Sequence, residues 1–514
     1  MSSPGKLRET LIQRGEISQS SQTTDGARVL EVFEINKPYA YSIIIKDSET
    51  EELTYKVVEP TLSDKETNLL AQIRELLLET LDITMSDFDS PKDAEKYMTE
   101  RVRYIVRSHK LKADTNLIEK INYFIVRDYV GYAKIDAMMR DAFIEDISCN
   151  GVGVPIFVWQ RDYESLPTNV SFDSDQELES FVVRLAYRSG RMISVARPML
   201  DASLPDGSRI QMTLGRQVTQ HGSTFTIRKF KVDPITLIDL IRLNTVSADL
   251  AAFLWFMVEN KFSIFVCGGV ASGKTTQLNA FSTFIRPDSK IVTVEDTPEI
   301  QLYHKNWLPA VTRQSSGVSS AEISLFDLLR ASLRQRPDYL IVGEVRGEET
   351  YTLFQAMATG HLGMATMHAD SLKVAIHRLE TEPMNIPRVL ISGLNLITIQ
   401  ARVQKDGKPV RRTLSVSEIF GLDPVTNEIL TNELFSWEPT SDSYRFVGRS
   451  RLLEGYSQRS GIPMVAVNES IMRRETILKW MLKKNILRFD QVTAVIRKFY
   501  SNPDEVYGSA RSEL

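Results

Sequence analysis

Cysteine is nearly absent from this chain of 514 residues, which contains only Cys149 and Cys267. Two cysteines that lie far apart in the sequence provide no disulfide framework, and no C-x-x-C pair exists to hold a structural zinc ion. We therefore expect a protein that is stabilised by its hydrophobic cores in a reducing environment, such as the cytoplasm.

Long apolar segments are also missing. No run comes close to the roughly 20 apolar residues that a membrane-spanning helix needs. The residues that follow Met1 lack the apolar core of a secretory signal. If the protein works at a membrane, we expect it to bind there peripherally from the cytoplasmic side.

A surplus of charge of one sign is likewise absent, because 62 basic and 66 acidic residues leave a net charge of -4. Proteins that bind nucleic acid through phosphate contacts usually carry a basic surplus, so we expect no nucleic-acid partner. The basic segment from Arg101 to Lys112 is better explained as a solvated helix face, although it would also suit acidic lipid headgroups.

The apolar pattern divides the chain into several regions, as its length requires. From about residue 237, apolar runs at residues 263–267, 290–294, 339–342 and 363–367 alternate with helical stretches, which is typical of a parallel α/β sheet. The predicted regions are a mobile tail at 1–28, an N-terminal mixed and helical domain at 29–140, a second α+β domain at 141–230, a linker at 231–236, a nucleotide-binding domain at 237–450 and a C-terminal helical region at 451–514.

The most informative feature is the segment GGVASGKTT, which fits the phosphate-loop pattern G-x-x-x-x-G-K-[ST]. A predicted strand precedes it and a helix-compatible stretch follows it, as phosphate binding requires. We expect Lys274 to bind the β- and γ-phosphates and the Thr275 hydroxyl to bind Mg²⁺. The residues expected to surround the phosphates are Gly268, Ala271, Ser272, Gly273, Lys274, Thr275 and Thr276.

Two carboxylates follow at the carboxyl ends of predicted strands, where open α/β sheets bind their ligands. Glu295 lies in VEDTPE and Glu344 lies in RPDYLIVGEVRG. Glu295 is the candidate base for the attacking water, and Glu344 is the candidate Mg²⁺ ligand, partly through water. Which of the two is the base stays open. Elsewhere in a chain, an isolated Glu-Asp pair such as Glu295-Asp296 would rather cap a helix or lie in a solvated turn.

His368, in TGHLGMATMHAD, follows the last of these strands and is expected to respond to the γ-phosphate. A satisfied core histidine is the ordinary alternative. Only His361 accompanies it, without a third ligand, so we expect no zinc site. Arg346 is either a structural anchor or a charge sensor, and a salt bridge to Glu348 or Glu349 is the simpler alternative.

Arg209 and Arg228 precede the nucleotide-binding region. Phosphoryl transfer gains from an arginine that another domain or subunit supplies. From spacing alone, however, both would be assigned to the protein surface.

The order GxxxxGK[ST], VEDTPE, RPDYLIVGEVRG and TGHLGMATMHAD resembles the secretion ATPases of type II secretion and type IV pili. IEDISCNG at residues 144–151 and LPDGSR at residues 204–209 extend the resemblance through the second domain. Within this family, the sequences of the motifs are most similar to those of the motor ATPases of the archaellum, the archaeal flagellum. The strings that carry this similarity are YVGY, GSTFTIRKF, ASGK and EDT. Many bacterial relatives carry a four-cysteine zinc module, which a chain with two cysteines cannot form.

The resemblance implies a RecA-like α/β ATPase domain, an α+β N-terminal region and assembly as a hexameric ring. It implies ATP and Mg²⁺ at the phosphate loop, with Arg209 and Arg228 as charge stabilisers near a neighbouring subunit's nucleotide. It also implies a polytopic membrane platform protein and other archaellum motor components as partners. The implied function is assembly and rotation of the archaellum, with an archaeal type IV pilus or type II secretion ATPase as the alternative.

Two other classes of function deserve comparison. A nucleic-acid translocase would also be a ring of such domains, but the net charge of -4 disfavours it. A non-catalytic scaffold gated by nucleotide is disfavoured because Lys274, Glu295 and Glu344 are all present.

Overall fold

The structure is a computed structural model that describes residues 28–80, 88, 90–230, 234–313 and 322–514. Its contacts divide the chain into two compact units, Met1–Phe230 and Lys231–Leu514. The predicted tail at 1–28 lies outside the described residues except for Arg28, which begins the first strand. Residues 231–233 of the predicted linker are also outside them, and Thr236 already caps the next helix. The finer boundaries at residues 140 and 450 stay predictions.

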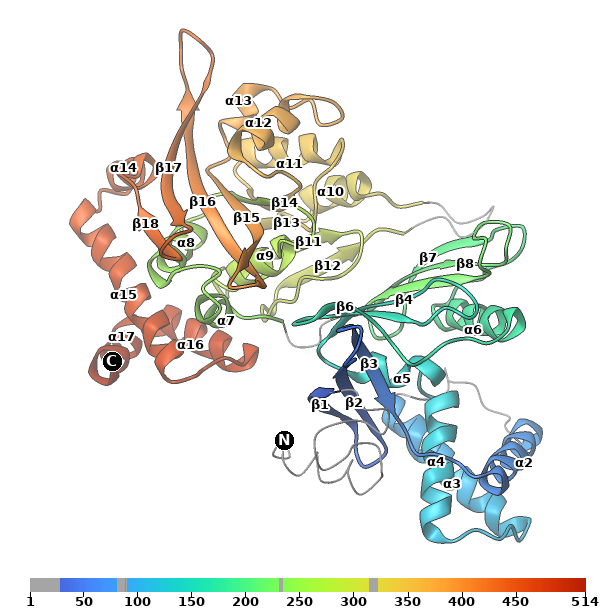
Figure 1. Cartoon of the computed structure of the whole chain (residues 1–514). Helices are drawn as coiled ribbons and strands as arrows, with labels where there is room; N and C mark the ends of the chain where they lie inside the picture. The colour runs from blue at the N-terminus through green and yellow to red at the C-terminus, as the bar shows by residue number, and fades with distance from the viewer. Residues whose placement is uncertain (1–27, 81–87, 89, 231–233, 314–321) are drawn as a thin grey trace. The chain divides into compact units, whose positions relative to one another are not determined.

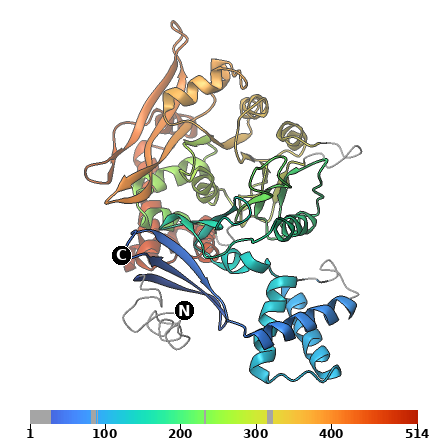
Figure 2. The same cartoon turned by 45° about the vertical axis from the view of Figure 1, so that its right-hand side comes forward.

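The N-terminal unit begins with a three-stranded antiparallel sheet in the order β1-β2-β3. Its strands are β1 (Arg28–Asn36), β2 (Ala40–Lys46) and β3 (Leu53–Val58). Helices follow where the apolar spacing changes from two to nearly four residues. They are α2 (Asp64–Thr80), α3 (Pro91–Ser108), α4 (Thr115–Tyr129), the short 3₁₀ turn η2 (Ala133–Ile135) and α5 (Asp136–Arg140). Figure 2 shows β1–β3 as a sheet of their own, with the helices gathered near one end of it.

The helices α3 and α4 start at side-chain caps. Ser90 accepts a hydrogen bond from the Asp93 N–H, and Asp114 accepts one from the Leu117 N–H, which satisfies amides that a helix leaves free. The apolar face of α3, with Met98, Val102 and Ile105 among its members, is buried, while Tyr104 on the other side is 58% exposed. Arg101 donates to the Thr80 carbonyl.

The second half of this unit is a six-stranded sheet in the order β6-β5-β4-β9-β8-β7, whose strand pairs are all antiparallel. The strands are β4 (Ile144–Cys149), β5 (Phe157–Gln160), β6 (Glu164–Pro167), β7 (Met199–Ser203), β8 (Arg209–Thr213) and β9 (Thr224–Arg228). Helix α6 (Asp175–Arg188) packs on this sheet through Phe181, which lies 5.4 Å from the Phe225 ring of β9.

The second unit is built on a nine-stranded sheet in the order β12-β11-β13-β14-β10-β15-β16-β17-β18 (Figure 1). Its six parallel strands are β10 (Ile264–Gly268), β11 (Ile291–Glu295), β12 (Trp307–Val311), β13 (Tyr339–Val342), β14 (Leu362–Met367) and β15 (Leu396–Lys405). β16 (Lys408–Leu422), β17 (Ile429–Glu438) and β18 (Ser443–Phe446) continue the sheet antiparallel. The RecA-like α/β fold class predicted from the motifs is confirmed.

Helices cover both faces of the parallel part. Successive residues of β10 alternate between two cores, with Ile264 and Val266 in one and Phe265 and Cys267 in the other, so every position of the strand is buried. Two helices precede the first strand, α7 (Leu237–Arg242) and α8 (Ala248–Glu259). The helices between the strands are α9 (Lys274–Ser282), α10 (Leu325–Leu333), α11 (Glu349–Ala358), α12 (Leu372–Glu380) and α13 (Arg388–Ile391).

The C-terminal helices α14 (Arg451–Ser460), α15 (Met464–Lys483), α16 (Phe489–Ser501) and α17 (Pro503–Glu513) share the core of the second unit. The Trp255 ring of α8 stacks on Phe284 at 4.9 Å and donates its indole N–H to the Tyr500 hydroxyl. Arg474 is buried beside them and binds Glu259. Among the helices of the described residues, none combines the length and the apolar character that a membrane crossing needs.

Candidate nucleotide-binding site

The phosphate loop joins β10 to α9, as the sequence predicts. Ala271 and Gly273 have φ values of 57° and 88°, in the left-handed region that lets successive N–H groups point to one side. The Ser272 hydroxyl is buried and donates to the Gly269 carbonyl at 2.9 Å, so this side chain braces the loop. Lys274, Thr275 and Thr276 form the first turn of α9, where the helix N-terminus favours an anion.

Lys274 connects the loop to the neighbouring strand. Its ammonium donates to the Gly269 carbonyl at 2.7 Å and lies 3.4 Å from Nδ1 of His368. His368 directly follows β14, which pairs with β10 through Cys267 and Met367. His368 therefore contacts Lys274, and its predicted response to the γ-phosphate stays a prediction.

His368 in turn contacts Glu344, whose Oε1 lies 3.2 Å from Nε2. Burial and the nearby Lys274 ammonium lower the pKa of His368, although Glu344 acts in the opposite direction. The imidazole is thus neutral at neutral pH. Because an ammonium only donates, Nδ1 accepts from Lys274, and the proton of the neutral imidazole is on Nε2, the nitrogen that lies 3.2 Å from Glu344.

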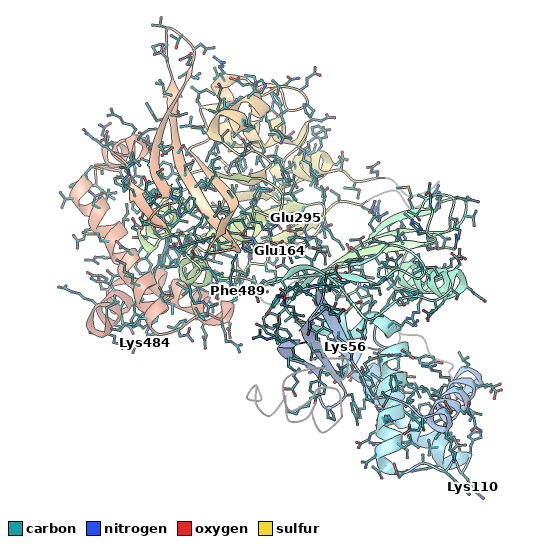
Figure 3. All side chains as sticks on the ribbon, in the orientation of Figure 1. Lys56, Lys110, Glu164, Glu295, Lys484 and Phe489 are labelled. Atoms are coloured by element: carbon teal, nitrogen blue, oxygen red, sulfur yellow. The ribbon has the colours of Figure 1, made fainter. Side chains whose placement is uncertain are left out.

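Glu295, labelled in Figure 3, ends β11, and β11 pairs with β13, the strand that precedes Glu344. Its side chain is buried, and Oε1 accepts the N–H groups of Glu299 and Ile300 at 2.9 and 3.1 Å. A Cβ atom added to Gly343 would lie 3.1 Å from Cγ of Glu295, so a larger residue there would push against this side chain. The strand order thus brings Glu295, Glu344, His368 and the loop to one edge of the sheet.

Arg346 binds other carboxylates than Glu348 and Glu349, the partners of the simpler alternative. Its Nη2 donates to Asp296 at 2.7 Å, and its Nε lies 3.7 Å from Glu344. The Glu349 carboxylate instead accepts the backbone N–H groups of Arg346 and Gly347. The salt bridge to Glu348 or Glu349 was a wrong expectation, because the turn after β13 directs the guanidinium across to the end of β11.

Of the two ordinary alternatives for Asp296, a helix cap is wrong, whereas its exposed carboxylate does lie at a bend after β11. The segment after it leads to β12 without a helix, so Asp296 caps none. Its carboxylate binds Arg346 and receives the Thr312 hydroxyl at 3.3 Å. Asp296 and Arg346 together tie the ends of β11 and β13 at the site.

Thr275 and Glu344 are the residues that would hold Mg²⁺. A hydroxyl and a carboxylate are oxygen donors of the kind that Mg²⁺ prefers, and this ion commonly takes few protein ligands and completes its shell with phosphates and water. Within the described residues no group of three or more His, Cys, Asp and Glu side chains forms a metal cluster. The donor set therefore fits a nucleotide-bound Mg²⁺.

Arg209 and Arg228 belong to the N-terminal unit. They are direct partners in the antiparallel β8–β9 ladder, and Asp146 on β4 lies opposite Arg228 on its other side. Cross-strand partners present their side chains on one face, so the two arginines share a face of this sheet. Their approach to a phosphate loop stays a prediction.

Two residues at the loop were missed by the sequence analysis, Gln400 on β15 and Arg411 on β16. Arg411 donates from Nε to the Ala271 carbonyl at 3.1 Å, and Gln400 pairs with Gly268 in the β10–β15 ladder. They follow the loop by more than a hundred residues, and no motif surrounds them. Only the order of the strands reveals them.

Fold and site together define an α/β nucleotide-binding protein with a phosphate loop, two carboxylates and a histidine at one edge of its sheet. Residues 131–491 match the sequence profile of the family described as Type II/IV secretion system protein, and the chain belongs to this family. Residues 13–61 match a second profile, described as PilB3-like, N-terminal. The predicted resemblance to secretion ATPases is confirmed at the level of the family.

Relatives and solved structures show where the similarity extends. An uncharacterized protein of Methanocaldococcus jannaschii is 37% identical over 472 residues, which cover 87% of this chain and 85% of that protein. Conjugal transfer protein TrbB of Rhizobium radiobacter is 32% identical over 232 residues, which cover 44% of this chain and 69% of TrbB.

Two solved structures are similar over much of their own length. The ATPase DotB of Legionella pneumophila is 16% identical with a TM-score of 0.43, over 73% of this chain and 95% of DotB. The pilus retraction motor PilT with bound ADP is 21% identical with a TM-score of 0.40, over 55% of this chain and 80% of PilT.

Proposed function

We propose that this protein is a Mg²⁺-dependent ATPase that converts hydrolysis into mechanical work on a membrane-embedded secretion or filament machine. The observation that carries the proposal is the chain of polar contacts from Lys274 through His368 to Glu344, a hydrogen bond of 3.4 Å followed by a nitrogen-to-oxygen contact of 3.2 Å. It links the group expected to bind the β- and γ-phosphates to a carboxylate on the next strand but one. The presence or absence of the γ-phosphate at Lys274 is thereby coupled to the position of the Glu344 carboxylate at the edge of the sheet.

In this proposal each residue has a separate task. The loop amides and Lys274 bind the phosphates, and Thr275 and Glu344 hold Mg²⁺, which neutralises charge on the phosphates when it is bound. Glu295 orients and deprotonates the attacking water. The neutral imidazole of His368 responds to a γ-phosphate through the bond that it shares with Lys274.

The active-site test compares two isosteric variants, Glu295→Gln and Glu344→Gln, with Glu348→Gln as an exposed control from the same turn. Phosphate release at saturating MgATP should fall about 10²–10⁴-fold in Glu295→Gln, the range of general-base catalysis, while nucleotide binding persists. Turnover that stays normal in Glu295→Gln and collapses in Glu344→Gln would transfer the role of base to Glu344. Normal turnover in both variants would refute the proposed site.

We further propose a hexameric ring in which Arg209 and Arg228 stabilise charge at a neighbouring subunit's nucleotide. Their shared face on the β8–β9 pair supports a joint role, because both guanidinium groups are presented in the same direction. Mixing Lys274→Ala subunits with Arg228→Ala subunits tests it. Mixed rings should regain activity if Arg228 acts across an interface, and no recovery at any ratio would indicate action within one subunit.

The finer function that we propose is assembly and rotation of the archaellum, from the cytoplasmic face of the membrane. The partners would be a polytopic platform protein, other archaellum motor components and acidic lipids along α3, where Arg103 and Arg107 accompany the exposed Tyr104. This finer function is supported by the similarity of the sequence motifs to those of the archaellum motor ATPases. The alternative, a type IV pilus or type II secretion ATPase, is favoured by membership of the Type II/IV secretion system family.

Deletion of the gene separates these roles. Loss of swimming with retained surface adhesion indicates the archaellum, and loss of adhesion pili with normal swimming indicates pilus assembly. Stimulation of the ATPase by acidic liposomes, compared with DNA, tests the membrane contact, and stimulation by DNA alone would favour a nucleic-acid translocase.

A further inference from the structure

The turn between β7 and β8 carries the motif LPDGSR, and only the last residue of this motif, Arg209, has a proposed task. The backbone of the turn closes on itself. The Gly207 N–H donates to the Leu204 carbonyl at 2.9 Å, and the Leu204 N–H donates to the Ser208 carbonyl at 2.8 Å. Gly207 has a φ of 85°, a conformation that favours glycine. The turn therefore has a defined conformation that ends directly before Arg209.

A buried serine joins this turn to a distant part of the chain. Ser208 is 1% exposed. Its hydroxyl donates to Oδ2 of Asp206 at 2.9 Å, and Oδ1 of the same carboxylate accepts the Ser208 N–H at 3.1 Å. The hydroxyl oxygen also accepts the backbone N–H of Phe230 at 3.0 Å, across 22 positions of the sequence. One hydroxyl thus acts as donor within the turn and as acceptor for Phe230.

Phe230 is the last residue of the N-terminal unit, so the linker starts directly after it. Its ring also lies against the turn, because a Cβ atom added to Gly207 would lie 3.1 Å from Cγ of Phe230. The residue before it is anchored separately. The Lys229 ammonium donates to the carbonyls of Met138 and Asp141 at the end of α5. The start of the linker is therefore held both by the turn and by α5.

The anchored residues adjoin the two arginines that are proposed to act at a neighbouring subunit's nucleotide. Ser208 directly precedes Arg209, and Lys229 directly follows Arg228. Arg209 and Arg228 are themselves partners, at the end of the β8–β9 ladder. The hydrogen bond from Phe230 to Ser208 continues the connection between the two chain segments beyond this ladder. A displacement of Phe230 would thus reach the arginine pair through a single hydrogen bond.

We propose that Ser208 is a positioning residue whose hydroxyl holds the start of the linker on the turn that carries Arg209, so that a movement of the linker is passed on to the arginine pair. This inference rests on the proposed function, because it assumes that Arg209 and Arg228 act at a neighbouring subunit's nucleotide. It names the group through which domain movement in the ATPase cycle would set the arginines. Without this bond Arg209 would keep its strand but lose its tie to the linker.

The test places Ser208→Ala in one of two kinds of subunit, which are then mixed. Lys274→Ala subunits supply the arginines, and Arg228→Ala subunits supply the phosphate loop, so the parent mixture regains ATPase activity. Ser208→Ala within the Lys274→Ala subunits should lower this recovered activity by about two- to tenfold, the value of one lost hydrogen bond. The same substitution within the Arg228→Ala subunits should leave the recovered activity unchanged.

This asymmetry separates positioning from a purely structural role. Damage to the fold or to ring assembly would lower the recovered activity equally in both placements, and this outcome would overturn the proposal. Unchanged activity in both placements would overturn it as well. Unfolding curves of each variant show whether the fold is kept.

A second variant and a matched control complete the experiment. Asp206 is exposed, and Asp206→Ala removes the acceptor of the Ser208 hydroxyl. It should show the same asymmetry as Ser208→Ala with a smaller loss, and absence of the asymmetry from both variants would refute the role of Ser208. Ser165→Ala changes an exposed serine of β6 in the same sheet and should match the parent mixture in either placement.

Failure of the proposed function would be visible in other samples. If the parent mixture regains no activity, action of the arginines across an interface is refuted, and the inference that rests on it is refuted too. If the wild type binds no ATP, or if Lys274→Ala binds it normally, the nucleotide site itself is refuted. If the parent mixture recovers and the asymmetry is missing, only the role of Ser208 is refuted.

Discussion

Gly268 and Gly269 are neighbours in the phosphate loop, yet the structure predicts opposite responses to alanine. A Cβ atom on Gly268 would lie 2.6 Å from Oγ of Ser272 and closer still to the carbonyl oxygen of Gln400, whereas a Cβ atom on Gly269 would meet nothing within 4 Å. The packing around Gly268 therefore leaves no room for a side chain, whereas a side chain at Gly269 would have free space. We expect Gly268→Ala to impair nucleotide binding and Gly269→Ala to be tolerated.

The magnitude follows from what must move. Ordinary van der Waals contact begins at 3.4 Å, so the Ser272 oxygen would have to retreat by 0.8 Å (3.4 Å minus 2.6 Å). The Gln400 carbonyl belongs to the β10–β15 ladder, where it pairs with Gly268, and cannot yield without moving the sheet. Overpacking of this kind costs about 1–3 kcal/mol, and a loop displaced to avoid it loses about tenfold in affinity for each 1.4 kcal/mol.

The assay combines titration with a fluorescent ATP analogue and chemical unfolding of the wild type and both alanine variants. Gly268→Ala should lose affinity by at least about tenfold, or lose about 1–3 kcal/mol of unfolding free energy, or both. Gly269→Ala should match the wild type in both measurements. Normal binding and stability of Gly268→Ala would refute the packing argument, and equal loss in the two variants would refute the distinction between the glycines.

Two further predictions concern stability. Arg474→Ala should lower the free energy of unfolding by about 3–5 kcal/mol in denaturant titrations, because it removes the partner of the Glu259 carboxylate in a buried ion pair. A loss below about 1 kcal/mol would mean that water solvates Glu259 in the variant. His304 is buried and donates from Nε2 to the Ile285 carbonyl, and burial lowers its pKa below the ordinary value of 6.5. Its contribution to stability is thus complete above pH 6.5 and is lost as the pH falls below that value, because the unfolded chain then takes up the proton more readily. The variant His304→Gln should lose less stability between pH 8 and pH 5 than the wild type, in denaturant unfolding, and parallel pH profiles would contradict this assignment.

The chemistry of the phosphate loop and of the strand ends could be predicted from the sequence because both are local. Lys274 and Thr275 stand at fixed offsets from Gly268, and a wholly apolar strand followed by Glu344 or His368 predicts a ligand-facing side chain without knowledge of the neighbours. The same argument located β10, β11, β13 and β14 within one or two residues. β15 to β18 escaped prediction, since charged residues such as Arg411, Arg412 and Glu418 interrupt their apolar pattern.

Partners across the sheet were beyond such local reasoning. Arg346 binds Asp296 because β11 and β13 are neighbours, although 50 residues separate the two side chains. Helix α3 illustrates the reverse case: the basic segment from Arg101 to Lys112 was expected to be a solvated helix face, and α3 runs to Ser108, near Lys110 (labelled in Figure 3).

The sequence by itself determined where the phosphate-loop motif lies, between Gly268 and Thr276, because such a loop is made of consecutive backbone groups whose conformation depends on adjacent residues. It also determined membership of the secretion family, through boxes that are each short and local. Only the tertiary structure decided that Lys274, His368 and Glu344 contact one another in sequence, and that Arg411 binds the Ala271 carbonyl from the other side of the loop. The reason is physical: strand order in a parallel sheet depends on how helices and strands pack as a whole, and the order β13-β14-β10-β15-β16 sets which residues meet at the loop.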